Sequence, residues 1–160
     1  MSFDNTVLAA APNLPAGELI SDSVGNVSAY EVFQNDLMVG RFAKFDGGSL
    51  DILDGSATPV IAGIVKRKVT NEIGSILYKT TGREIDSVAE VINFGFATVT
   101  VTDAADPSKY DAVQVINADT AEAGKATDAS VTAGIINVPN VVFWELKATN
   151  VWLVRINQFI

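Results

Sequence analysis

Short runs of β-branched and aromatic residues, separated by Gly, Asp and Asn, recur from about residue 26 to the end of the sequence. Such closely spaced strand-forming runs and turn residues are typical of an all-β sandwich or barrel. At 160 residues the chain is long enough to bury one hydrophobic core but short for two domains of ordinary size. We therefore predict an all-β fold, a β-sandwich or barrel-like single domain formed by residues 26–160.

The clearest predicted strand is Val91–Thr102, with the sequence VINFGFATVTVT. Strict alternation places Ile92, Phe94 and Phe96 on one face, followed on that face by three threonines. Gly95 falls on the opposite face and predicts a bulge or a close approach by another chain. Further strands are predicted at residues 37–45, 59–65, 75–79, 113–116, 141–146 and 151–159.

The last two predicted strands flank the sequence KATN, whose length and polarity suit the turn of a hairpin. Both faces of the final strand are largely apolar, which predicts burial by the core on one side and by a neighbouring subunit on the other. Trp152, Val154 and Ile156 lie on one face of this strand. We predict that the opposite face forms an oligomer interface. The residues of that opposite face are Val151, Leu153, Arg155 and Phe159.

The segment DTAEAGKATD is the one place where a helix is predicted, at Asp119–Ala126, because Ala and Glu favour helix although Gly124 weakens it. The pair Gly124-Lys125 is also reminiscent of a phosphate-binding loop. Such a loop requires Ser or Thr directly after the lysine, where Ala126 stands. We therefore expect no nucleotide site in this segment.

The chain has no histidine and no cysteine. The usual general base at neutral pH, the Ser-His-Asp and Cys-His arrangements, thiolate metal sites and disulfides are all missing. A glycosidase with paired carboxylates stays formally possible, because Asp and Glu are plentiful. We predict no catalytic residues, no cofactor and no metal.

Glycines and aspartates in VGRFAKFDGGSLDILDG, residues 39–55, are interpreted as turns, because Gly accepts positive φ and Asp can bond its own backbone. Asp46, Asp51 and Asp54 also allow a structural calcium, although they do not follow the alternating pattern of a calcium loop. Arg41 lies in an apolar run and has two interpretations. In the first, the side chain extends to solvent or pairs with a nearby acidic residue. In the second, it forms a salt bridge across a subunit interface.

Nineteen acidic residues against eleven basic ones give a net charge of −8, which repels phosphate backbones, so we predict no nucleic-acid partner. The composition is 48% hydrophobic and the mean hydropathy is +0.27, yet charged residues interrupt every candidate membrane span. Part of this apolar surface is expected to be buried against partners. We read no export signal at the N-terminus and expect synthesis in the cytoplasm.

The segments VGRFAKFD at residues 39–46 and AGIVKRK at residues 62–68 resemble the matching segments of the head decoration, or structural cement, proteins of tailed bacteriophages. The order of segments agrees as well: an arm rich in Ala, Pro and Gly, the two similar strands, and a strand-rich second half. The resemblance implies a non-enzymatic virion protein that binds the outer capsid surface and cements neighbouring major capsid subunits as a small homo-oligomer, a trimer or else a dimer. Alternatives are a tail or baseplate component, and a carbohydrate-binding or hydrolytic β-sandwich. The last is the weaker one, because the two tryptophans, Trp144 and Trp152, both lie in apolar strands that we expect to form the core.

Residues 1–25 contain small residues and prolines without a sustained period, which predicts an extended N-terminal arm. Such a segment can add to the edge of another sheet through backbone hydrogen bonds. Given the resemblance, we expect the arm to lie along capsid subunits, with Phe3, Val7 and Leu8 as anchors. The alternative is that the arm embraces a neighbouring copy of its own oligomer.

Overall fold

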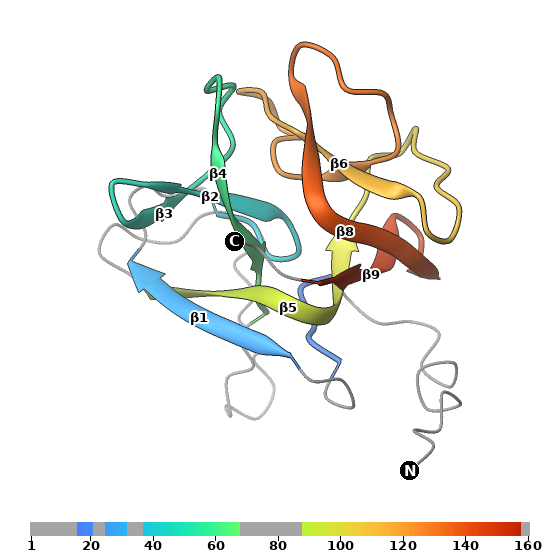
Figure 1. Cartoon of the computed structure of the whole chain (residues 1–160), viewed down its shortest axis with the longest axis horizontal. Helices are drawn as coiled ribbons and strands as arrows, with labels where there is room; N and C mark the ends of the chain where they lie inside the picture. The colour runs from blue at the N-terminus through green and yellow to red at the C-terminus, as the bar shows by residue number, and fades with distance from the viewer. Residues whose placement is uncertain (1–15, 21–24, 32–36, 68–87, 158–160) are drawn as a thin grey trace.

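The computed structural model describes residues 16–20, 25–31, 37–67 and 88–157 of the chain, and these residues contain no helix. They form nine strands that build an antiparallel sheet curled into a half-barrel (Figure 1), which confirms the all-β prediction. The strands are β1 (Asn26–Glu31), β2 (Phe42–Asp46), β3 (Ser49–Asp51), β4 (Val60–Val65), β5 (Val88–Thr100), β6 (Ala112–Ile116), β7 (Ala126–Thr127), β8 (Ile135–Ala148) and β9 (Val151–Ile156).

The strand order is β3-β2-β4-β5-β9-β8-β6-β7, with β1 also paired to β5. The long strand β5 therefore belongs to both halves of the sheet (Figure 1). Its first part pairs with β1 and β4, and its second part, from Gly95 to Thr100, pairs with β9. Because β5 is shared, the two halves are joined through continuous backbone and not through a linker.

The alternation of β5 changes phase near Gly95. Ile92 and Ala97 both lie in the same buried cluster, although residues an odd number apart in a regular strand point to opposite faces. Two irregularities cause the change: Asn93 is an extra residue where β1 pairs with β5, and Gly95 has a φ of 101°. The prediction that Ile92 shares a face with Phe96 and the following threonines is therefore wrong. The strand does contain a bulge, but its extra residue is Asn93 and not Gly95, where the bulge was predicted.

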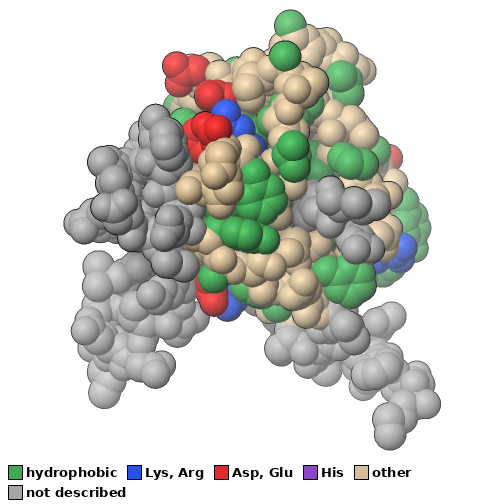
Figure 2. Space-filling view, turned by 60° about the vertical axis from the view of Figure 1, so that its left-hand side comes forward, with side chains coloured by type: hydrophobic (Ala, Val, Ile, Leu, Met, Phe, Trp, Pro, Cys, Tyr) green, Lys and Arg blue, Asp and Glu red, His purple; other side chains and the backbone are tan. Residues whose placement is uncertain are grey.

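Two apolar clusters fill the interior. The main core lies between the two halves of the sheet and includes Phe42, Ile64, Phe143 and Ile156, none of them more than 2% exposed. A second cluster is formed by buried residues of β2, β3, β4 and the start of β5. Half-buried side chains including Tyr30 and Phe45 pack against it on the outer face of this part of the sheet. Figure 2 shows hydrophobic side chains exposed on this face.

Residues 16–20 lie along the second part of β5. The Gly17 and Ile20 N–H groups donate to the carbonyls of Thr98 and Phe96, and the Thr98 N–H donates to the Glu18 carbonyl. This part of the predicted arm is thus hydrogen-bonded to the sheet of its own chain. Residues 1–15, with Phe3, Val7 and Leu8, lie outside the described residues.

The predicted hairpin is confirmed, since β8 and β9 pair around a turn at Thr149 and Asn150, where Asn150 has a φ of 57°. The Gly47-Gly48 turn is confirmed as well, because it joins β2 to β3. The strand predicted at residues 37–45 begins only at Phe42, after a turn in which the Arg41 N–H donates to the Met38 carbonyl at 3.3 Å. The strand predicted at residues 75–79 lies outside the described residues.

The helix predicted at Asp119–Ala126 is wrong. The segment forms turns and then enters β7 at Ala126. Gly124 has a φ of 77°, and a Cβ there would stand 2.6 Å from the Phe42 carbonyl oxygen. Packing against β2 and hydrogen bonds from Arg41 override the helix propensity of Ala and Glu. No helix in the described part of the chain is long and apolar enough to cross a membrane.

Candidate interaction surface

Trp144 is the extra residue of a bulge in β8. Phe143 pairs with Val154 of β9 and Glu145 pairs with Leu153, so Trp144 has no partner of its own in β9. Phe143 is completely buried in the main core, whereas Trp144 is half-buried and outside both apolar clusters. A bulge re-aims a side chain in this way, and here it turns the indole away from the core.

Two further aromatic rings pack edge-on against the indole of Trp144. The centroid of the Phe96 ring lies 5.2 Å away with an interplanar angle of 76°, and that of Tyr110 lies 5.4 Å away at 88°. This edge-to-face geometry is favourable for aromatic pairs. Phe96 is half-buried, while Tyr110 is 62% exposed. The cluster therefore reaches solvent mainly through Tyr110.

Tyr110 is held in an uncommon backbone conformation, with a φ of 76°. Its N–H donates to the Phe143 carbonyl at 2.7 Å, and the Phe143 N–H donates to the Asp111 carbonyl at 2.9 Å. The Ser108 N–H also donates to the Asp111 carboxylate at 2.7 Å. A bulky residue keeps a positive φ only where its surroundings fix it. The turn thus presents the Tyr110 ring in a defined position beside β8.

Two cations flank the same aromatic rings. The Lys109 ammonium lies 4.1 Å from the centroid of the Trp144 ring and 5.1 Å from that of Tyr110. The Arg155 guanidinium lies 5.8 Å from the Trp144 centroid, and its Nε–H donates to the Asn157 side chain at 3.0 Å. These are cation–π distances. We call this group of residues the Trp144 surface; it consists of Phe96, Lys109, Tyr110, Trp144 and Arg155.

Of the residues predicted at an oligomer interface, Arg155 lies on the Trp144 surface. Val151 is half-buried at the start of β9. Leu153 faces away from the main core, as predicted, but it is completely buried within the chain itself. A partner therefore has no access to the Leu153 side chain. Phe159 lies outside the described residues.

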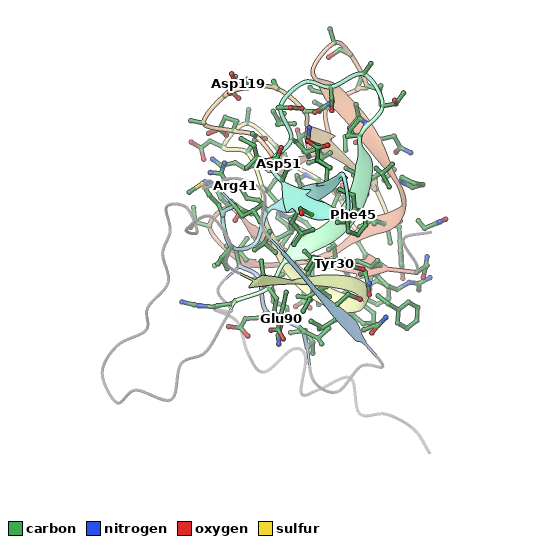
Figure 3. All side chains as sticks on the ribbon, turned by 90° about the vertical axis from the view of Figure 1, so that its left-hand side faces the viewer. Tyr30, Arg41, Phe45, Asp51, Glu90 and Asp119 are labelled. Atoms are coloured by element: carbon green, nitrogen blue, oxygen red, sulfur yellow. The ribbon has the colours of Figure 1, made fainter. Side chains whose placement is uncertain are left out.

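Arg41 bonds to its own chain. Its Nη1 donates to the carbonyls of Ala121 at 2.6 Å and Ala123 at 3.0 Å, which fixes the turns that replace the predicted helix. Burial lowers the pKa of Arg41, and the nearby Glu122 carboxylate opposes that shift. Arg41 and Asp119 line a pocket of 240 Å³ at one side of the molecule (Figure 3). This volume is below the usual range for small-molecule sites.

The three aspartates considered for calcium have other roles. The Asp54 carboxylate pairs with the buried Lys44 ammonium at 2.7 Å and accepts from the Ser56 N–H at 3.1 Å. The Asp51 carboxylate accepts from the Ile52 N–H at 2.8 Å, and Asp46 is exposed at the end of β2. Within the described ranges, no cluster of three or more acidic side chains is arranged to hold a metal ion.

Comparison with known proteins decides the family. The family model for the XM1 gp53 minor capsid protein matches residues 3–157. The chain belongs to this family. A chain from the solved capsid of Myoviridae phage XM1 is 66% identical, with a TM-score of 0.81 and complete coverage of both chains. No curated protein matches. The family and this structural neighbour are phage capsid proteins, so the similarity to tailed-phage capsid proteins is confirmed and the family's role is structural.

Sequence reasoning missed most of the Trp144 surface, because it assigned Trp144 and Trp152 alike to the core. Trp152 does pack against the main core, whereas the bulge turns Trp144 outward. One signal was available in the sequence. Lys109 and Tyr110 stand among turn-forming residues in DPSKYD, and an aromatic residue in such a polar segment indicates an exposed ring.

Proposed function

We propose that the protein is a non-enzymatic structural component of the virion that binds the outer surface of the phage head and cements neighbouring major capsid subunits. The observation that supports this most strongly is its full-length 66% identity to a chain of a phage capsid. The chemistry of the sequence agrees with the proposal, because a chain without histidine or cysteine lacks the commonest catalytic groups.

A cement protein needs a rigid body and contact area. The shared strand β5 supplies rigidity, since it connects both halves of the sheet. Contact area is available in the high hydrophobic content of the chain and in exposed side chains such as Tyr110 and Leu146, which are 62% and 57% exposed. Apolar area of this kind offsets the entropic cost of association. We expect the working unit to be a homo-oligomer, a trimer or else a dimer.

The N-terminal arm is the second part of the proposal. Residues 16–20 are bonded to β5, so the residues before them start from a fixed place on the sheet. Phe3, Val7 and Leu8 then contact coat subunits in an extended conformation, with backbone hydrogen bonds giving affinity and alternate side chains giving specificity. Ordering of the arm on binding would reduce its net affinity.

Electron microscopy of assembled virions tests the position of the protein. We expect density for this chain on the outer head surface, in contact with at least two coat subunits. Density inside the head, or in the tail or baseplate, would contradict the proposal. Light scattering tests the oligomer, since a mass of 16.9 kDa at micromolar concentration would show a monomer.

A variant lacking residues 1–15 tests the arm, because it retains the strand segment at residues 16–20. Its oligomer mass and its binding to expanded heads are compared with those of the full chain. Loss of head binding with an intact oligomer supports the capsid arm. Loss of the oligomer shows that the arm embraces a neighbouring copy instead, and unchanged binding rejects a role for the arm.

A further inference from the structure

Most of the cations in the described part of this acidic chain pair with its own carboxylates. Five of the described lysines and arginines form ion pairs between 2.7 and 3.9 Å. Arg41 instead donates to two backbone carbonyls. Within the described ranges this leaves Lys109 and Arg155, for which no carboxylate lies within ion-pair distance. Both of them contact the ring of Trp144.

This distribution is informative because the chain has a net charge of −8, so carboxylates are in excess. Two cations without ion pairs contact one half-buried indole, so an incoming negative group finds two unpaired cations at this place. The ring holds the cations in place without neutralising them. A carboxylate that approaches the Trp144 surface can form charge-assisted hydrogen bonds with both.

The aromatic part of the Trp144 surface suits a protein partner. Trp, Tyr and Arg are the residue types most enriched among those that dominate binding energy at interfaces. Tyr110 is exposed, yet its backbone is fixed by the hydrogen bond of its N–H to Phe143. A preformed ring costs less entropy on binding than a mobile one. The Lys109 ammonium lies over the indole at 4.1 Å, which disfavours a sugar ring stacked on the same place.

We propose that the Trp144 surface binds an acidic, extended segment of a coat subunit. Aspartate or glutamate carboxylates of that segment contact Lys109 and Arg155, and a neighbouring apolar side chain packs on Tyr110. The coat subunit as the partner rests on the proposed function. The preference for an acidic segment rests on the charges and rings of this surface alone.

The experiment measures binding of purified protein to expanded heads that lack it, by co-sedimentation at several salt concentrations. We expect Lys109→Ala and Arg155→Ala each to weaken head binding about tenfold or more and to reduce its salt dependence. Lys109→Arg should retain binding, because it keeps the charge over the ring. The matched control is Lys125→Ala, which removes a cation that already pairs with Glu122 at 2.9 Å and should leave binding unchanged.

Thermal melting and light scattering of each variant keep the outcomes distinct. If the wild-type protein does not bind heads, the proposed function fails. If the wild-type protein binds and folded Lys109→Ala and Arg155→Ala variants bind equally well, this inference alone is overturned. If these variants lose their oligomer mass but still bind heads, the surface contacts a second copy of this chain, which also overturns the inference. A Tyr110→Ser variant gives an independent measurement, with weaker binding expected at unchanged salt dependence.

Discussion

The ammonium of Lys44 and the carboxylate of Asp54 lie 2.7 Å apart, with the lysine side chain 7% exposed and the aspartate 44% exposed. Lys44 belongs to β2, and Asp54 follows β3, so the pair ties the loop after β3 back to the sheet. A buried cation without its carboxylate is unfavourable. This relationship gives the Asp54 carboxylate a role in the stability of the fold.

The pH dependence of stability follows from this pair. The hydrogen bond from Lys44, the largest cause, lowers the pKa of Asp54 to about 2. A carboxylate whose folded-state pKa is depressed contributes stability above its unfolded pKa of about 3.9, and that contribution is lost as the pH falls toward 2. Because the Asp54 carboxylate is 44% exposed and solvent screens the pair, we expect Asp54→Asn to reduce the free energy of unfolding at pH 7 by only about 1 kcal/mol.

Urea unfolding at pH 7, 4 and 2 checks this expectation. The difference between wild type and Asp54→Asn should shrink between pH 4 and pH 2. Asp46→Asn is the control, because this carboxylate is exposed at the end of β2 and should change stability little at any pH. An equal loss of stability from both substitutions would argue against the role of the Lys44 pair.

A second prediction concerns Gly95, whose φ of 101° lies at the point where β5 changes phase. An L-residue at this φ is strained, so Gly95→Ala should destabilise the fold by about 1–3 kcal/mol. Thr100→Val in the same strand is the control and should cost much less. Thermal melting decides between them, and a Gly95→Ala variant as stable as wild type would contradict the strain.

Leu153 gives a third prediction. Because this side chain is completely buried, Leu153→Ala should lower the free energy of unfolding by about 2–5 kcal/mol. Leu153→Glu should fail to fold, since it places a charge in a buried site. Circular dichroism and melting measure both. A folded Leu153→Glu protein with reduced oligomer mass would instead show that this residue lies at a subunit interface.

Removal of metal ions gives the fourth prediction. Asp54 is engaged by Lys44, and Asp51 accepts the neighbouring backbone N–H, so neither carboxylate needs a cation. We expect EDTA to leave the melting temperature unchanged. A decrease of several degrees that calcium restores would revive a site that includes Asp46, Asp51 and Asp54.

The sequence predicted those parts of the fold that local chemistry determines. The hairpin around Thr149 and Asn150 and the Gly47-Gly48 turn depend on residues a few positions apart. The prediction of a helix at 119–126 was wrong, because the Arg41 side chain donates to the Ala121 carbonyl, which a helix would use for its own hydrogen bond. Arg41 is 80 residues away in sequence, so no local pattern could reveal this contact. Trp144 was misplaced for a similar reason, since the bulge that turns it outward arises only when β8 pairs with β9.

Strand β5 also constrains the order in which the parts of the chain can fold. Its Asn93 bonds to Ser28, 65 residues earlier, and its Thr98 accepts from Glu18, 80 residues earlier, while β9 pairs with it only at the end of the chain. Contacts this distant in sequence close slowly, on the scale of milliseconds to seconds for β folds. The main core includes Val154 and Ile156 of β9, so it closes only after β9 has paired with β5, across the intervening residues 101–150, in which β6, β7 and β8 must also find their places.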